Sequence, residues 1–375
     1  MEYNEASRIN VVEPLVSLKR DLTNARSISA KVVLDAITGA SPTGAMPTDH
    51  PQTITSASGR VSTVHTGDMP KKSFRDHRAS IYLSYVQPLL RTVNAEIGGH
   101  LSAESDYLSR GTTLTINWDT PDRLTTFSLG AGANSDLVEP TGGGKPLGLS
   151  PSSDPARYGN AKKKVVDGLA GISRVMSRSW LMQLNYSYTQ EKGYLTEPYK
   201  VISILNADGS PHGDFVTENR PSTRMRHSVY LGSNYQFEDD VGYFSYRYYW
   251  DDWGIKAHTI DLKYRYEMDD GQYLVPHFRY YTQTAVNFFS YGLIAGDPLP
   301  LYATSDYRFG EMSTMTFGCN YAFPINDYYE FNIRLEYMRQ DGNLHPTQAI
   351  GVQQTLDLFE PVNTLILQLG YKFNL

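Results

Sequence analysis

The chain has 375 residues, with 40% hydrophobic residues and a mean hydropathy of −0.41. No run approaches the roughly 18 apolar residues that a membrane-spanning helix requires, which argues against a helical membrane protein. The net charge of −6 comes without a basic block, so nucleic-acid binding is not expected. The single cysteine, Cys319, excludes an intrachain disulfide framework and a thiolate metal site, and its alternating neighbours indicate a small apolar strand residue.

The N-terminal residues MEYNEASRINVVEP contain neither a charged n-region nor an apolar h-region, so they show no signal peptide. The first clear strand is predicted over residues 8–19, and it runs toward a short turn. A bacterial outer-membrane barrel normally starts and ends on the periplasmic side. We therefore expect residues 1–4 to be the end of a truncated first strand, which turns at residues 5–7.

Apolar and polar residues alternate with a period of two along most of the chain. Examples are WLMQLNYSYTQ, YFSYRYYW, HTIDLKYRYE and YEFNIRLEYM. Such segments predict strands with one apolar and one polar face. The nearest helical candidate, residues 162–177, contains Gly168 and Gly171, which weaken a helix, so its second half is predicted to be a strand.

Short turns alternate with long connections that are rich in Gly, Pro, Ser, Thr and Asp. The longest connections cover residues 39–75, 139–161, 202–224, 285–306 and 341–360. Two connections on the same side are predicted to be tight, near residues 108–111 and 251–254. This layout predicts an all-β fold, a transmembrane antiparallel β-barrel of about 16 strands, with short periplasmic turns and long extracellular loops. We expect one domain over residues 1–375.

A soluble sandwich is the alternative to a membrane barrel. The apolar faces carry aromatic residues toward the strand ends, where girdles at the membrane interfaces would lie; these are Trp180, Trp250, Trp253, Tyr328, Tyr329 and Tyr371. Long strands in hairpin order also bury their edges most simply by closing. We therefore expect a location in the bacterial outer membrane, in contact with outer-membrane lipid and lipopolysaccharide.

The polar faces of the predicted strands carry charges of both signs, as the wall of a water-filled lumen would. The candidates for this wall are Arg247, Asp261, Lys263, Arg265, His277, Arg279, Arg334 and Glu336. With tight turns, Asp261 lies opposite Arg279, Lys263 lies opposite His277, and Arg247 falls near Asp261. Such a row serves as a structural salt-bridge row or as a positive stripe that attracts anionic solutes.

No sequence pattern points to catalysis, a cofactor or a metal. The acidic pairs in turns lack the spacing of a calcium loop, no HExxH spacing occurs, and Pro146 follows Lys145 where a phosphate loop requires Ser or Thr. Ser228 and His258 are conceivable hydrolase residues, but no G-x-S-x-G context supports them. The chain is therefore predicted not to be an enzyme, with no cofactor and no metal.

The C-terminal octet QLGYKFNL alternates strictly and matches the β-signal that the barrel-assembly machinery recognises. The matching positions are Gln368, Gly370, Phe373 and Leu375, the last being Leu where Phe or Trp is usual. This predicts a closing strand and makes the assembly machinery an expected partner.

Several long stretches resemble a bacterial outer-membrane barrel family known only as domain of unknown function number thirty-five seventy. They are LDAITGASPTGAMP, QLNYSYTQEKGYLTEPYK, RYYWDDWGIKAHTIDLKYRY and LVPHFRYYTQTAVNFF. The family has no established activity, so the resemblance implies no site residues. Its members are often encoded near a small lipoprotein, a thioredoxin-like protein and a flavin transferase, which implies a small lipoprotein or an envelope redox protein as a partner.

These observations favour a porin-like transport barrel that gives passage to small solutes, with residues 39–75 as the first candidate for a constriction or lid. The alternative is a non-conducting scaffold barrel that holds a lipoprotein or redox partner. An outer-membrane hydrolase is the third hypothesis.

Overall fold

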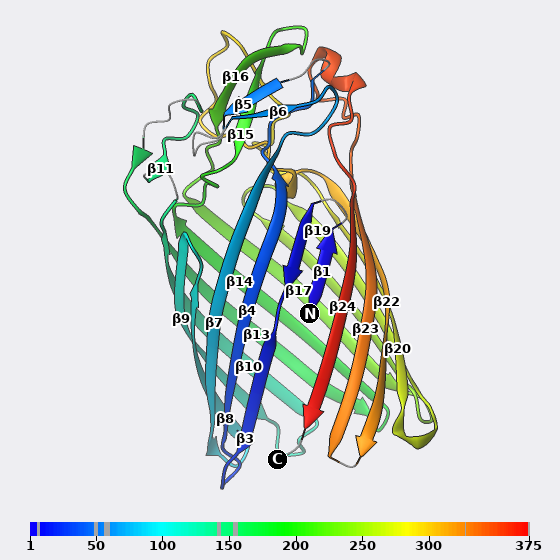
Figure 1. Ribbon diagram of the computed structural model, residues 1–375. Coiled ribbons are helices and arrows are strands. Elements are labelled where there is room, and N and C mark those ends of the chain that lie inside the picture. Colours follow the sequence, from blue (N-terminus) through cyan, green and yellow to red (C-terminus); the bar gives the residue numbers. More distant parts are fainter. Residues whose placement is uncertain are drawn as a thin grey trace.

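The protein forms a closed antiparallel β-barrel of 16 wall strands, which confirms the predicted fold class (Figure 1). The computed structural model describes residues 1–5, 8–48, 52–55, 61–140, 144–152, 157–326 and 328–373. Short turns lie at one end of the barrel and long loops at the other (Figure 1). Within the described residues, no helix has the length and apolar character needed to cross a membrane.

The wall consists of strands that each pair with their neighbours in chain order. They are β1 (Glu2–Glu5), β2 (Ile9–Val12), β3 (Leu15–Asp21), β4 (Ser27–Pro42), β7 (Lys71–Leu90), β8 (Val93–Ala103), β9 (Tyr107–Asp119), β10 (Thr125–Val138), β13 (Ala161–Ser177), β14 (Trp180–Gly193), β17 (Thr223–Gln236), β18 (Val241–Asp251), β19 (Lys256–Glu267), β20 (Tyr273–Gln283), β22 (Met312–Asn326), β23 (Tyr329–Gly342) and β24 (Val362–Phe373). β2 and β3 both pair with β4 and count as one wall strand, interrupted at Pro14, which has no backbone N–H to donate.

The barrel closes between its first and last strands. β1 pairs with β24 from Glu2 opposite Leu367 to Glu5 opposite Thr364, and it also pairs with β2. The N-terminal residues therefore form a wall strand, as predicted. On the side of β24 that faces β1, no described residue pairs with residues 368–373. The predicted turn at residues 5–7 includes two residues outside the described ones.

Two sequence predictions differ from the observed strands. The whole segment from Ala161 to Ser177 is strand β13, because β10 and β14 hydrogen-bond it on both sides and override the weak helical pattern. The first tight connection on the long-loop side lies at residues 104–106, between β8 and β9, and not near residues 108–111. There the alternation of β9 simply continues four residues further toward the N-terminus than expected.

The outer face of the barrel is apolar. Leu129, Leu369 and Ile97 are 64%, 59% and 59% exposed, and they belong to a large set of exposed Leu, Ile, Val, Phe, Tyr and Trp side chains on alternate strand positions. Alternation places these side chains on one side of the sheet and the polar residues on the other. A closed sheet with an apolar exterior has the character of an outer-membrane-type barrel.

Most of the predicted girdle aromatics lie on this outer face near strand ends. Tyr328 is 65% exposed, and the Tyr329 and Tyr371 rings stack with centroids 5.7 Å apart. Trp253 is an exception, because it is only 4% exposed. The Asp251 carboxylate accepts the backbone N–H groups of Trp253 and Ile255 at 3.1 and 2.9 Å, which folds this turn over the lumen and away from lipid.

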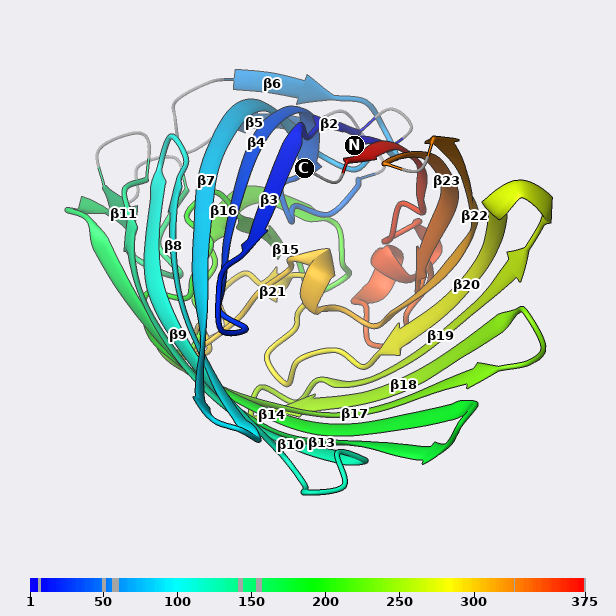
Figure 2. The same ribbon diagram turned by 90° about the horizontal axis from the view of Figure 1, so that it is seen from below.

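The loops contain short elements of their own. They are β5 (Gln52–Thr55), β6 (Val61–Val64), β11 (Lys145–Pro146), β12 (Arg157–Tyr158), β15 (Val201–Leu205), β16 (Pro211–Thr217), β21 (Leu293–Ile294) and the 3₁₀ turns η2 (Tyr307–Phe309) and η3 (Gly351–Thr355). A further 3₁₀ turn, η1 (Asp269–Gly271), lies in a short turn at the other end. Seen along the barrel axis, β15 and β21 lie across the lumen (Figure 2).

Candidate functional site: the lumen wall and the loop cap

A histidine between two carboxylates is the centre of one polar cluster on the lumen wall. The Nδ1 atom of His277 lies 2.6 Å from Glu336 Oε1, and its Nε2 atom lies 3.0 Å from Asp261 Oδ2. Arg334 Nε donates to the same Glu336 oxygen at 2.7 Å. Lys263 Nζ lies 3.7 Å from Asp261 Oδ1. The cluster therefore links β19, β20 and β23 by charge-assisted contacts.

Gly318 on β22 makes this cluster possible. It lies opposite His277 on one side and opposite Glu336 on the other. A Cβ atom at Gly318 would come within 2.3 Å of Glu336 Cγ. The missing side chain therefore lets Glu336 extend across β22 and reach the imidazole on the next strand.

The predicted row is present only in part. The registers of Asp261 with Arg279 and of Lys263 with His277 are as predicted. Arg247, however, lies opposite Thr259, and its guanidinium packs 5.6 Å from the centre of the Tyr230 ring. The prediction of one carboxylate between two guanidiniums is wrong, because the register of β18 places Ser245, and not Arg247, opposite Asp261. The Asp261 carboxylate instead contacts His277 and Lys263.

The remaining wall candidates differ in how their charges are balanced. Arg265 donates to Glu267 and lies 3.8 Å from the centre of the Tyr273 ring. Arg247 and Arg279 make no ion pair with any described residue, and both are exposed on the lumen face. The wall between β18 and β20 thus carries cations that are not neutralised by contact.

A second charged ladder lies closer to the long loops. Lys163 Nζ is 3.9 Å from Asp136 and 3.5 Å from Glu191, and Arg226 donates to Glu191 at 3.1 Å. The ladder runs from β10 through β13 and β14 to β17. Sequence reasoning missed it, although each of these residues occupies an inward position in an alternating segment.

The long loops pack together into a cap over the lumen. In it, β15 pairs with β16 and, in parallel, with β21 from a different loop, Ile204 lying opposite Leu293. The first long loop joins them, since Met46 N–H donates to Ser203 Oγ at 2.9 Å. Residues 43–48 of the predicted lid thus contribute to the cap, while its centre comes from residues 194–222 and 284–311.

The cap has its own apolar core and further links between loops. Ile202, Val216 and Ala303 form a buried cluster, in which Ile202 has no exposed surface. The last long loop is attached through Gln353, whose side-chain amide donates to Gly209 O at 3.0 Å. Backbone and side-chain contacts thus join loops far apart in the sequence into one body.

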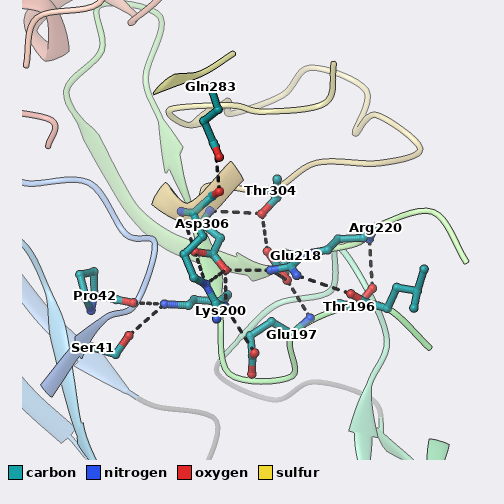
Figure 3. A network of polar contacts seen from close by, with 12 residues as sticks. Ser41, Pro42, Thr196, Glu197, Lys200, Glu218, Arg220, Gln283, Thr304 and Asp306 are labelled. Carbon is teal, nitrogen blue, oxygen red and sulfur yellow. Dashed lines mark hydrogen bonds and ion pairs between the residues drawn. The ribbon is translucent and has the colours of Figure 1, made fainter. Parts of the chain in front are cut away.

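A buried ion network lies within this cap (Figure 3). Arg220 Nη2 is 2.6 Å from Glu218 Oε1 and 2.9 Å from Asp306 Oδ2, and both carboxylates are fully buried. Asp306 also accepts hydrogen bonds from Arg308 at 3.0 Å. Lys200 donates to Pro42 O and to Ser41 Oγ, which ties the network to the end of β4 (Figure 3).

Burial and neighbouring charges shift the pKa values of this network in opposite directions. Burial raises the pKa of Glu218, against the opposing effect of Arg220. Burial also acts to raise the pKa of Asp306, but the cations of Arg308, Lys200 and Arg220 together hold it below its ordinary value. Burial lowers the pKa of Lys200, partly offset by Asp306. Asp306 is therefore a firmly ionised anchor, and Glu218 is the titratable member.

Between cap and wall lies a cavity of about 350 Å³. Its wall side includes Lys163, Glu191 and Arg226 from the second ladder, and its cap side includes Tyr199 and Phe309. Paired charges on one side and aromatic rings on the other make a polar, narrow space at the lumen mouth. This space and the ladder are the candidate functional site.

The sequence comparison assigns the chain to a family. The family model described as a protein of unknown function (DUF3570) matches residues 1–373. The chain belongs to the DUF3570 family. No curated protein matches it in sequence.

Solved structures with a similar arrangement are outer-membrane proteins. The outer membrane transporter YddB from Escherichia coli matches with 8% identity and a TM-score of 0.40, over 96% of this chain and 61% of its own. The outer membrane protein opdK from Pseudomonas aeruginosa matches with 7% identity and a TM-score of 0.41, over 99% of this chain and 95% of its own. The Pseudomonas putida toluene transporter TodX matches with 8% identity and a TM-score of 0.40, over 100% of this chain and 87% of its own.

Two other groups of residues in this DUF3570 chain bear on chemistry. Ser228 and His258 lie on opposite faces of the sheet. His258 faces outward, with its Nδ1 atom 2.7 Å from the Tyr246 hydroxyl, whereas Ser228 occupies an inward position of β17. They do not form a hydrolase pair. Asp76, Glu104 and Asp106 bring carboxylate oxygens within 4.8 Å of one another at the rim.

The predicted assembly signal lies on β24. Gln368 pairs with Arg334, Gly370 with Asn332 and Phe373 with Tyr329, and the Phe373 side chain is 41% exposed. The last member, Leu375, lies outside the described residues. Recognition of this strand by the assembly machinery stays a prediction.

Proposed function

We propose that this chain is a transport barrel of a bacterial outer membrane that gives passage to small solutes through its charged lumen. A closed barrel of about 16 strands is wide enough for an aqueous channel unless loops fill it. The observation that carries the proposal is the contrast between the two faces, with exposed apolar side chains outside and ladders of charge such as Asp136–Lys163–Glu191–Arg226 inside. Lipid would contact the apolar outer face, and water would contact the charged inner face.

In this proposal the loop cap sets the size and the charge of what passes. Solutes would move through the space between cap and wall, which is lined by Lys163, Glu191 and Arg226. Arg247 and Arg279 further along the lumen would favour anions, since they are exposed and lack an ion-pair partner among the described residues.

Solute uptake into liposomes tests the proposal. Liposomes with purified, folded protein should swell in isotonic solutions of small solutes and should not swell with solutes too large for the cap. A double variant, Arg247→Gln with Arg279→Gln, should slow the uptake of small anions more than that of neutral solutes. Swelling no faster than that of protein-free liposomes, for every small solute, would contradict the proposal.

A second candidate function is a non-conducting scaffold for a lipoprotein or redox partner. The packed cap favours it, because fully buried carboxylates such as Glu218 and Asp306 belong to a stable body and not to an open mouth. A partner that co-purifies in fixed ratio with a barrel that does not conduct would support the scaffold, whereas conduction by the protein alone would favour transport.

A further inference from the structure

Four basic side chains form an outward-facing patch near the long-loop ends of neighbouring strands. They are Arg110 on β9, Lys162 and Lys164 on β13, and Lys192 on β14, and all are exposed. Arg110 lies opposite Ser135, Ser135 opposite Lys164, and Lys164 opposite Lys192. Three of the four cations therefore lie in one continuous row across the sheet, and Lys162 is two residues nearer to the strand end.

The outward direction of these side chains follows from strand alternation. Arg110 shares its face with Leu114 and Trp118, which are 46% and 56% exposed. Lys164 shares its face with Val166, which is 53% exposed. The cations thus lie directly beyond the apolar outer band, at the level where lipid headgroups would meet a membrane barrel.

In the triplet Lys162–Lys163–Lys164, the lysine on the inner face has acidic partners and the two lysines on the outer face have none among the described residues. Lys163 points inward and is paired with Asp136 and Glu191. None of the outward cations forms an ion pair with a described residue. The outward positions of β9, β10, β13 and β14 carry no acidic residue, so this face has an unbalanced positive charge.

A groove beside the patch adds room for a polar headgroup. It has a volume of about 690 Å³ and borders Lys162 and Gly193 at the strand ends. Lys145, Asn160 and Asn219 also line it and supply a further cation and two amides. Such a lining suits sugar hydroxyls and phosphate oxygens.

We infer that this patch docks a phosphate-bearing glycolipid of the outer leaflet. The phosphates would lie against Arg110, Lys162, Lys164 and Lys192, the sugars in the adjoining groove, and the acyl chains along the apolar band below. The inference rests on the proposed outer-membrane location but not on solute passage. Charge complementarity and the position of the patch above exposed apolar side chains select a lipid over a free anion.

Binding of fluorescent lipid A to the purified protein in detergent tests the inference. Each basic residue near an anionic lipid surface contributes to the attraction, so the quadruple variant R110Q/K162Q/K164Q/K192Q should bind at least roughly tenfold more weakly. The matched control R20Q/R91Q/R178Q/K372Q removes four basic residues at the short-turn end of the barrel and should bind as the unaltered protein does. Heat-modifiable gel migration verifies that both variants are folded.

Further binding measurements distinguish a glycolipid phosphate from other anions that could occupy the patch. Lipid A without phosphates should bind the unaltered protein and the quadruple variant equally. Inorganic phosphate at millimolar concentration should not displace phosphorylated lipid A, and an acidic polypeptide such as polyglutamate should not compete. Displacement by either competitor, or equal binding of lipid A by the folded quadruple variant, would overturn the inference. Solute uptake in liposomes that lack lipid A should be the same for both proteins, so a failure of transport would be recognised separately.

Discussion

Gly318 is a position where the lumen wall has no room for a side chain. A methyl group there would lie 2.3 Å from Glu336 Cγ, so Gly318→Ala should push Glu336 away from His277. We expect a loss of about 1–3 kcal/mol of stability, the usual effect of overpacking. The temperature at which half of the protein migrates as the unfolded form on a gel measures this loss of stability.

Gly168→Ala is the matched control for this substitution. Gly168 is also in mid-strand, and a Cβ atom there meets nothing within 4 Å. An equal shift of the midpoint for both variants would show that the Glu336–His277 contact contributes nothing measurable.

Glu218 should make the stability of the cap depend on pH. Because burial raises its pKa above the ordinary 4.5, the folded cap takes up a proton at a higher pH than the unfolded loop does. This contribution is fully present below pH 4.5 and is lost as the pH rises through the raised value. Asp306 acts oppositely, since its lowered pKa makes its contribution present above 3.8 and lost at lower pH.

We therefore expect the cap to unfold at a higher temperature at pH 5 than at pH 7. The fluorescence of Trp253, in a variant that lacks the other tryptophans, measures this unfolding. Glu218→Gln should reduce this difference, because glutamine does not titrate. A pH dependence that is unchanged in the variant would assign it to other groups.

Single residues could be predicted from the sequence only where turn length fixes the register. The pairing of Asp261 with Arg279 followed from the short turn between their strands. The bridge from His277 to Glu336 skips β22, and it depends on Gly318, so no count along one hairpin could reveal it. The prediction that Trp253 belongs to an outer aromatic girdle was wrong, because the pattern of aromatic residues does not show which way a turn folds.

At the scale of elements, the joint between β15–β16 and the last long loop should respond to a single methyl group. Gly209 has φ +81° and a Cβ there would lie 1.9 Å from Ile350 O. Gly209→Ala should separate the two loops and loosen the cap. Proteinase K added on the loop side should then cleave the variant faster than the unaltered protein.

Gly213→Ala provides the control. Gly213 has φ +98° in the same loop, but a Cβ there meets nothing within 4 Å. Both substitutions carry the backbone strain of a left-handed alanine, roughly 1 kcal/mol or more. Only Gly209→Ala adds the collision, so equal cleavage rates would argue against this joint as a link between loops.

The elements also show the limits of the sequence. Alternation predicted the wall because each strand carries its own two-residue pattern, and the order of turns and loops predicted antiparallel neighbours. The cap joins Met46, Ser203, Leu293 and Gln353 from separate loops. Such contacts leave no period in the chain, which is why the sequence indicated only loop length, with residues 39–75 as the first candidate for a lid.

At the scale of the whole molecule, the closed barrel and the cap have opposite consequences for transport. The barrel offers a charged interior, while the cap packs the same interior at its long-loop end with Ile202, Glu218 and Asp306 fully buried. The account therefore predicts a channel whose conductance is limited by the cap and increases when the cap is loosened.

Planar-bilayer conductance tests this central claim most directly. The purified, heat-modifiable protein should insert as small ohmic steps, and Gly209→Ala should give larger or more frequently open steps than Gly213→Ala. Silent membranes with both variants and with the unaltered protein, despite verified insertion, would contradict the transport account.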